Sequence, residues 1–305
     1  MGPLLVDRNA TQRDSIEPAS CHAIIVRDGA VLMRDGRLVE RVPGNHPTST
    51  LSVYLGRDGD KHLVALVPSD VATGAATHVD AADGWADTTP SELLTAGESM
   101  VGLREAIHLF AAQGTEGERQ REVAATAVAI TTWHANHQHC AVCGAATRPT
   151  LGGWVRRCDV DERDHYPRTD PAVIVAITDA DDRLLMAHAS YWSAHRFSHL
   201  AGYVEPGESF EQAVHREIAE EASLTVRDVT YVGSQPWPFP ASIMVGFTAR
   251  VDDPHFTLDE DEITEAMFVT RAELAGHVAA GTMIVAPRGS IARRMMEDWY
   301  GGPVE

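Results

Sequence analysis

The stretch GYVEPGESFEQAVHREIAEEASL, which begins at Gly202, constrains the fold of this 305-residue chain more than any other part of it. Ser209 followed by Gln212 has the form of a capping box, and a Pro-Gly turn stands just before it. Apolar residues then recur at every fourth position, namely Phe210, Val214, Ile218 and Ala222. The spacing predicts an amphipathic helix that starts near Ser209 and buries one face.

Three carboxylates fall at the edge of that buried face. With about 100° of rotation per residue, Glu217 and Glu221 lie on the flank of the apolar stripe and Glu220 lies beside them. Carboxylates this close and partly removed from water would repel one another unless they shared a cation. Mg²⁺ prefers oxygen ligands and is commonly completed by substrate phosphates, so the pattern favours phosphoryl or pyrophosphoryl chemistry over the alternative of a solvated acidic face.

The complete spacing resembles the Nudix box of hydrolases that act on nucleoside diphosphates linked to another moiety. It consists of Gly202, five residues, Glu208, seven residues, Arg216-Glu217-Ile218, one residue, and Glu220-Glu221. The penultimate glycine of the box is Ser223 here, which puts the turn after the helix in question. The resemblance implies a metal-bound catalytic set with Arg216 paired to Glu208, the metal ligands being Glu217, Glu220, Glu221 and, downstream, Glu265.

A second motif, SQPWPFPAS, begins at Ser234. Its three prolines hold the backbone extended, and Trp237 and Phe239 are large for an ordinary exposed loop. In isolation it would be read as a Pro-rich connection whose aromatic rings pack on a sheet. Following the box, it resembles the NADH pyrophosphatase branch of the Nudix family, and the resemblance extends over roughly residues 140 to 299, including YPR and SIARR.

That branch implies an α/β fold: a Nudix α/β/α sandwich with a mixed sheet, preceded by a zinc ribbon and an α+β N-terminal domain, in a homodimer. The implied reaction is Mg²⁺- or Mn²⁺-dependent hydrolysis of NAD(H) to nicotinamide mononucleotide and AMP, and the same chemistry would remove NAD caps from RNA. Tyr166 and Tyr203 are candidates for stacking on a base. The other expected substrate contacts are Gln235, Trp237, Phe239, Ser242 and the backbone of Ala292, with a packing role equally open for Tyr166 and Ala292.

Three cysteines have the spacing of a zinc ribbon that lacks its last thiolate. Cys140 and Cys143 are separated by two residues, and Cys158 follows after fourteen more. Asp161, three residues further on, is the favoured fourth ligand, slightly ahead of His165. The competing interpretation is a ribbon without metal held by packing. In either case the role is structural, because a closed zinc site has no open position for substrate.

The first third of the chain alternates apolar runs with Asp-Gly turns, in AIIVRDGAVLMRDGRLVERV and LSVYLGRDGDKHLVALV, which predicts an antiparallel sheet. Helical patterns follow in ELLTAGESMVGLREAIHLFAAQ and GERQREVAATAVAITTWHANH. The predicted domains are 1–133 (N-terminal α+β), 134–168 (zinc-ribbon-like) and 169–305 (Nudix). In the last of these, AVIVAITD, RLLMAHA, VRDVTYVGS, SIMVGFTARVD and EAMFV predict strands and SIARRMMEDWY predicts a terminal helix.

Composition limits the class of partner. The formal charge of -19 opposes broad binding to duplex nucleic acid, so an anionic substrate would need a divalent cation. No apolar run approaches the roughly 18 to 20 residues of a membrane span, and the first residues lack a signal peptide's apolar centre, which predicts a cytoplasmic protein without a membrane contact.

Two other functions fit the sequence less well. A nucleotide-sensing Nudix regulator is disfavoured by the intact REIAEE core and by the lack of a helix-turn-helix with a basic face in the sequence. A Nudix hydrolase for another dinucleotide, such as ADP-ribose, is disfavoured by the SQPWPFPAS motif.

Overall fold

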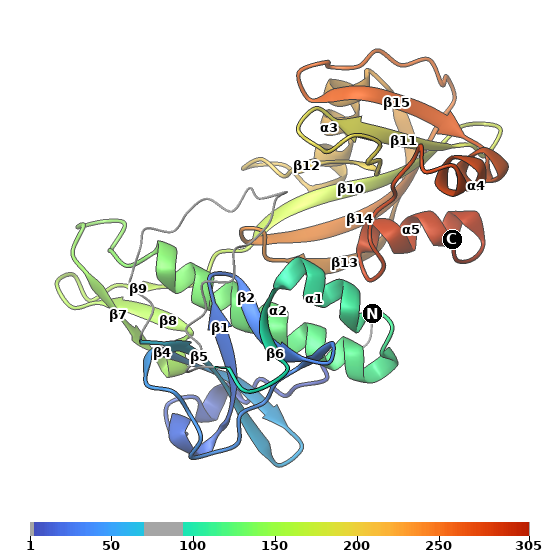
Figure 1. Cartoon of the computed structure of the whole chain (residues 1–305). Helices are drawn as coiled ribbons and strands as arrows, with labels where there is room; N and C mark the ends of the chain where they lie inside the picture. Colours follow the sequence, from blue (N-terminus) through green and yellow to red (C-terminus); the bar gives the residue numbers. More distant parts are fainter. Residues whose placement is uncertain (1–2, 70–93, 305) are drawn as a thin grey trace. The chain divides into compact units, whose positions relative to one another are not determined.

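The computed structural model describes residues 3–69 and 94–304 (Figure 1). These fall into two compact units. The C-terminal unit comprises Thr169–Trp237 and the chain from Ser242 onward, and the N-terminal unit comprises the chain up to Arg168 together with Pro238–Ala241.

A six-stranded mixed sheet forms the centre of the C-terminal unit. Its order is β13-β14-β10-β11-β15, and β12 pairs with β10. Strand β10 runs parallel to β14 and antiparallel to β11 and β12. The strands are β10 (Asp170–Thr178), β11 (Leu184–Ala189), β12 (Leu200–Tyr203), β13 (Val226–Trp237), β14 (Ser242–Val251) and β15 (Ile263–Val269).

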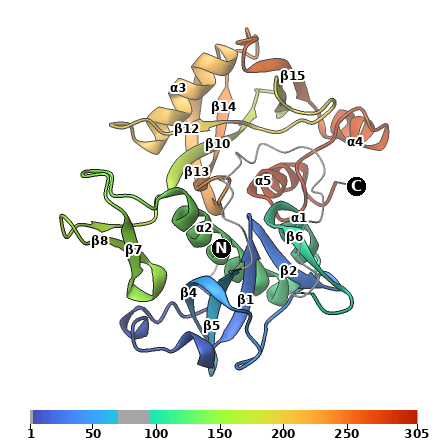
Figure 2. The ribbon, with the colours of Figure 1, turned by 60° about the vertical axis from the view of Figure 1, so that its left-hand side comes forward.

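Helices cover both faces of this sheet, with α3 (Phe210–Ala222) on one and α4 (Arg271–Ala279) and α5 (Ile291–Tyr300) on the other (Figure 2). Alternation along β10 explains the two layers, because successive side chains of a strand point to opposite faces. Val173 and Val175 pack in the core that contains α3, whereas Ile174 packs with α4 and α5. The predicted α/β/α sandwich with a mixed sheet is confirmed.

Helix α3 begins where the sequence predicts. The Ser209 hydroxyl accepts from the Gln212 amide at 3.2 Å, and the Gln212 side chain accepts from the Ser209 amide at 2.8 Å. Val214, Ile218 and Ala222 are fully buried, but Phe210 at the first position is exposed, so the buried face starts one turn later than the apolar spacing suggests.

The N-terminal unit has its own six-stranded sheet, of order β3-β2-β1-β5-β4 with β6 on β2. The Asp-Gly turns join antiparallel neighbours as predicted, since β1 pairs with β2 and β4 with β5 in that sense. The prediction of a purely antiparallel sheet is wrong at one pair, because β1 and β5 run parallel. The strands are β1 (His22–Arg27), β2 (Ala30–Arg34), β3 (Arg37–Leu38), β4 (Ser49–Asp58), β5 (Lys61–Pro68) and β6 (Glu98–Gly102).

Two helices follow, α1 (Leu103–Phe110) and α2 (Gly114–Asn136). The second helical pattern is confirmed by α2. The first is wrong in its earlier half, where Glu98–Gly102 pairs with β2 as β6, and its start at residues 92–93 lies outside the described residues. Pairing with β2, which is distant in sequence, makes Glu98–Gly102 a strand, and local periodicity cannot reveal such pairing. Short 3-10 turns occur at Ala10–Gln12, Pro18–Ser20 and Leu151–Gly153.

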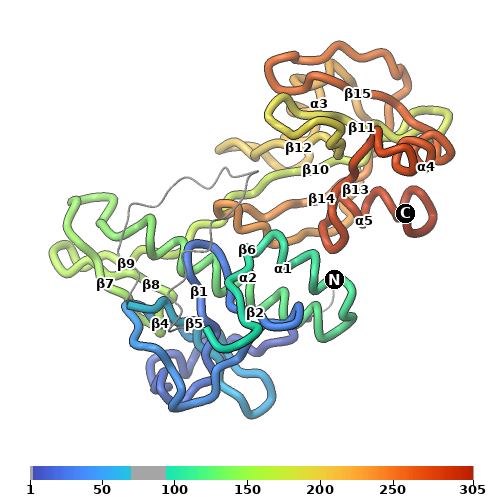
Figure 3. The backbone as a smooth tube through the Cα atoms, viewed as in Figure 1, coloured from blue at the N-terminus to red at the C-terminus, as the bar shows by residue number. Residues whose placement is uncertain are grey.

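After α2 the chain forms a small three-stranded sheet, β7 (Thr147–Thr150), β8 (Val155–Cys158) and β9 (Asp164–His165), which can be followed in Figure 3. No helix within residues 3–69 and 94–304 is both long and apolar enough to cross a membrane.

Candidate active site

Strand β12 approaches α3 at a glycine. A Cβ atom added at Gly202 would lie 1.9 Å from Cδ of Glu217, far inside any real contact distance. Gly202 pairs with Val173 of β10, so the sheet fixes its position. Only glycine therefore lets this strand lie directly under the Glu217 carboxylate.

Arg216 ties the loop to the helix. Its Nε atom lies 2.6 Å from Oε1 of Glu208, and its Nη2 atom donates to the Tyr203 carbonyl at 2.9 Å. Its Nη1 atom lies 2.9 Å from a carboxylate oxygen of Glu217 and 2.9 Å from one of Glu220. The hydrogen bond from Arg216 holds the pKa of the Glu208 carboxyl below its usual range.

Glu221 is the buried acid of the site. It is 5% exposed, and its Oε2 atom has no hydrogen-bond partner. Burial, together with the neighbouring carboxylates of Glu217 and Glu262, raises its pKa to about 8. Burial also raises the pKa of Glu217. A buried carboxylate oxygen without a hydrogen-bond partner, beside other acids, is suited to bind a hard divalent cation. The cation would supply the positive charge that no neighbouring side chain provides to this oxygen.

The carboxylates of Glu217, Glu220 and Glu221 are neighbours but do not form a tight ligand cluster. Among the residues the structure describes, the group whose ligand atoms all lie within 4.8 Å of one another is the cysteine cluster, not the glutamates. Arg216 explains the wider spacing, since its guanidinium holds oxygens of both Glu217 and Glu220. Glu220 is exposed, whereas Glu217 and Glu221 face the sheet.

Glu262 is an acid that the sequence reasoning missed. It contributes to the raised pKa of both Glu217 and Glu221, so these two carboxyls lie in its electrostatic field. The turn that carries it is tethered to α3, because the Asp259 amide donates to the Glu221 carbonyl at 3.1 Å. Glu265 stays a prediction: it is exposed on β15, opposite His188 of β11.

Tyr203 and Ser242 lie together among the expected substrate contacts. The two hydroxyl oxygens are 3.1 Å apart, with Ser242 buried and Tyr203 52% exposed. This pairing fixes the phenol end of Tyr203 and leaves the ring open to a ligand.

Gln235 and Ala292 are engaged within the protein. The Gln235 side chain donates to the Gly289 carbonyl at 2.7 Å and accepts from the Ile291 amide at 2.8 Å, so it holds the start of α5. The Ala292 carbonyl accepts from Nε2 of His199 at 3.2 Å. The Gln235 amide is thus engaged at both ends, and the Ala292 carbonyl is engaged with His199. The roles of Gln235 and of the Ala292 backbone as substrate contacts stay predictions.

The remaining expected contacts are distributed over the two units. Trp237 is half-buried at the end of β13, and Phe239 is half-buried in Pro238–Ala241, which groups with the N-terminal unit. Tyr166 belongs to the N-terminal unit and is exposed.

The cysteine cluster forms a four-ligand group of Cys140, Cys143, Cys158 and Asp161. Cys140 Sγ lies 3.3 Å from Oδ2 of Asp161, and the sulfur atoms of Cys143 and Cys158 are 3.5 Å apart. The cysteines are all free thiols. Three sulfurs and a carboxylate oxygen suit a tetrahedral structural zinc, and the geometry favours Asp161 over His165 as the fourth ligand.

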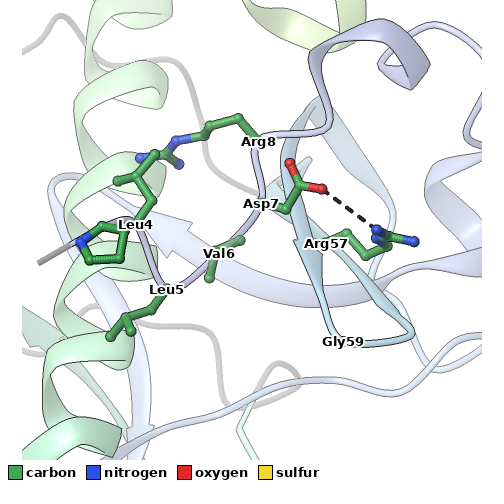
Figure 4. A pocket seen from close by; sticks show the side chains of 8 residues that line it. Leu4, Leu5, Val6, Asp7, Arg8, Arg57 and Gly59 are labelled. Atoms are coloured by element: carbon green, nitrogen blue, oxygen red, sulfur yellow. Dashed lines mark ion pairs between the residues drawn. The ribbon is translucent and has the colours of Figure 1, made fainter.

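A pocket in the N-terminal unit is a separate feature (Figure 4). It is lined by residues 3–8 with Arg57 and Gly59. Asp7 pairs with Arg57 at 3.6 Å, and Arg8 donates to the Thr126 hydroxyl at 2.9 Å. Its charged groups are thus engaged within the protein, and we assign it no ligand.

Comparison with known families identifies the two parts of the chain that carry these groups. Residues 168–288 match the NUDIX domain, and residues 135–166 match the NADH pyrophosphatase zinc ribbon domain. The sandwich and its acidic helix are therefore those of a Nudix domain, and the cysteine cluster is that of its ribbon.

Relatives extend the match over nearly the whole chain. An NAD-capped RNA hydrolase NudC of Deinococcus radiodurans is 33% identical over 287 residues, which cover 92% of this chain and 89% of that protein. The NudC of Mycobacterium bovis is 43% identical over 204 residues, 64% of this chain, and the match spans only 65% of that protein. The human NAD-capped RNA hydrolase NUDT12 is 33% identical over 60% of this chain and 42% of that protein. The chain belongs to the Nudix hydrolase family, in its NADH pyrophosphatase branch.

Among solved structures, a NUDIX hydrolase from Nitrosomonas europaea is similar with a TM-score of 0.43 and 19% identity, over 55% of this chain and 95% of that one.

Proposed function

We propose that the protein hydrolyses the pyrophosphate bond of NAD(H) to nicotinamide mononucleotide and AMP, and removes NAD caps from RNA by the same chemistry. The observation that carries the proposal is the buried, unpartnered Oε2 atom of Glu221 beside Glu217 on a Nudix helix. The names of the Deinococcus, mycobacterial and human relatives, all NAD-capped RNA hydrolases, support the choice of substrate.

In this proposal Mg²⁺ or Mn²⁺ would be held by Glu217, Glu220 and Glu221 of α3. A further ligand would come from Glu262, just before β15, or from Glu265 on β15. The bound ion supplies charge neutralisation of the diphosphate and a more acidic water. Arg216 keeps the helix and the Glu208 loop in register, and Gly202 keeps β12 under Glu217. The exposed ring of Tyr203 stacks on one base of the dinucleotide, with its hydroxyl held at Ser242.

Further parts of the proposal are a structural zinc in the ribbon, a homodimer and a cytoplasmic location. The three segments 1–133, 134–168 and 169–305 would act as N-terminal, ribbon and catalytic domains. Reduced thiols at all four cysteines are compatible with the proposed location.

The test is hydrolysis of NADH, ADP-ribose and NAD-capped RNA with Mg²⁺ or Mn²⁺. We expect the highest kcat/KM for NADH or the capped RNA, and a loss of at least about 100-fold in Glu221→Gln. Glu211→Gln, an exposed acid in the first turn of the same helix, is the matched control and should keep full activity. A higher kcat/KM for ADP-ribose would reject the substrate assignment, and binding of NADH without turnover would favour a nucleotide sensor.

A further inference from the structure

A short loop after β11 presents an aromatic side chain beside the acids of the site. The loop runs from Ser190 to Arg196, and Tyr191 is its most exposed aromatic residue, at 81%. Single exposed aromatic residues are common on protein surfaces and need no function. Tyr191 differs from such residues because its loop is bonded to the turn that carries Glu262 and lies beside Glu221 of α3.

The loop is fixed at both ends. The Ser190 amide donates to the Glu262 carbonyl at 2.8 Å, and its hydroxyl donates to the Asp261 carbonyl at 2.9 Å. At the other end the His195 carbonyl accepts from the Ile284 amide at 2.6 Å. Tyr191 therefore follows directly on a residue that is anchored to the backbone of an acid of the site.

Trp192 gives the exposed ring a rigid support. It packs against the core beneath α3, and the Arg196 guanidinium carbon lies 5.1 Å from its ring centroid. The Tyr191 and Trp192 centroids are 6.0 Å apart at an interplanar angle of 77°, an edge-to-face contact. The Tyr191 ring is thus exposed and held in place by Trp192. Binding a flat ligand to it would therefore cost little conformational entropy.

The position of this loop follows from contacts along α3. Midway along the helix, Arg216 bonds to the Tyr203 carbonyl. The next residue, Glu217, lies against Gly202, and one turn further on Glu221 lies against the Ala201 backbone and in the field of Glu262. Although the Tyr191 side chain is largely exposed, desolvation at its hydroxyl raises the pKa of the phenol, and the carboxylates of Glu221 and Glu262 act in the same direction. Tyr191 therefore lies beside the Glu221 end of the acids, whereas the Tyr203 side chain, which follows Gly202 on β12, lies on the opposite face of the sheet.

We propose that the Tyr191–Trp192 platform, held by Ser190 on the Glu262 turn, binds the second base of the dinucleotide, the one that Tyr203 does not hold. A dinucleotide carries one base on each side of its diphosphate. Carboxylates that hold the diphosphate through a cation, with the Tyr191 ring on the α3 side of the sheet and the Tyr203 ring on the other side, offer one ring to each base. This inference rests on the proposed function and names the subsite that the predicted contacts leave unassigned.

The test uses the two halves of the substrate as separate probes. Affinities for AMP and for nicotinamide mononucleotide are measured calorimetrically with Mg²⁺ on wild type, Tyr191→Ala and Tyr203→Ala. We expect Tyr191→Ala to weaken one probe by about 5- to 150-fold, the range of a lost base–aromatic stack, and Tyr203→Ala to weaken the other. Tyr191→Phe should bind as wild type. In NADH hydrolysis, Tyr191→Ala should raise KM and leave kcat near its wild-type value.

The matched control is Tyr231→Ala, another exposed tyrosine of the same unit, whose ring contacts Phe247 edge-on. It should change neither affinity. The inference is overturned if Tyr191→Ala alters neither probe, or weakens the same probe as Tyr203→Ala. Wild-type protein that binds neither probe and leaves NADH intact would overturn the proposed function itself, which distinguishes the two failures.

Discussion

Single residues set the precision of the acidic site, and Gly202 shows this most directly. Its missing side chain is what allows the Glu217 carboxylate to lie on β12, since a Cβ there would meet that carboxylate at 1.9 to 2.1 Å. Neighbouring backbone cannot yield, because Gly202 is paired with Val173 in the centre of the unit. The methyl group of alanine must therefore displace the Glu217 side chain.

We expect Gly202→Ala to lower kcat with a smaller effect on KM and to change stability little, because the methyl group displaces only the flexible end of the Glu217 side chain. Thermal unfolding and NADH hydrolysis measure the two effects. Gly276→Ala in α4 is the control, because a Cβ at that position meets nothing within 4 Å. Unchanged turnover in Gly202→Ala would show that the position of Glu217 does not matter for catalysis.

Buried His134 of α2 predicts how stability depends on pH. Its Nε2 atom donates to the Gly153 carbonyl at 2.7 Å, and its Nδ1 atom accepts from Nη1 of Arg156 at 2.9 Å, so the ring is neutral. Burial lowers its pKa to about 4, and the Arg156 guanidinium lowers it as well. A depressed pKa means that the folded state resists protonation, so its stabilising contribution is complete above about pH 6.5 and is lost as the pH falls toward 4.

We expect the wild type to lose on the order of 3 kcal/mol more than His134→Gln between those pH values. Urea unfolding of both proteins at several pH values measures the difference. His199, whose pKa burial also lowers to about 4, contributes equally to both proteins and cancels. Parallel pH profiles would mean that His134 accepts a proton without unfolding.

At the scale of the elements, the end of α3 departs from the family pattern without losing the turn. Ser223 takes the glycine position of the box and adopts φ 54° and ψ 26°, the left-handed conformation that costs other residues about 1 to 2 kcal/mol. We expect Ser223→Gly to stabilise the protein by about 1 kcal/mol and to leave activity unchanged. Calorimetric unfolding measures this against Ser223→Ala, which keeps the strain and should be neutral. An unaltered or lower melting temperature in the glycine variant would contradict the argument.

The ribbon offers a direct test of its fourth ligand. Asp161 lies within the group of three cysteines, and its carboxylate also accepts from the Arg163 amide at 3.1 Å, which orients it. We expect the wild type to contain about one zinc per chain and Asp161→Ala to lose most of it, with His165→Ala as the control that keeps it. Elemental analysis of purified protein decides between the two ligands. Loss of zinc only in His165→Ala would reverse the assignment.

Local signals made some elements predictable and left others out of reach. The Ser209 capping box and the Asp-Gly turns act within a few residues, so α3 and the hairpins followed from the sequence. Strand β6, the parallel pairing of β1 with β5 and the acid Glu262 depend on contacts between distant segments, which spacing does not record. Gln235 stands in a motif that suggests substrate, yet both ends of its amide hold the start of α5.

At the scale of the whole molecule, the charge of -19 acts on any anionic substrate before the site does. A capped RNA carries many more phosphates than NADH, so repulsion slows its approach more strongly. Salt screens this repulsion, with a Debye length of about 10 Å at 0.1 M.

We therefore expect kcat/KM for NAD-capped RNA to rise several-fold between about 20 and 200 mM KCl at saturating Mg²⁺, while the value for NADH changes little. A basic surface that guides the RNA would instead release counterions and make kcat/KM fall with salt. Such a fall would show that local positive charge, not the net charge of the chain, governs how capped RNA reaches the acidic helix.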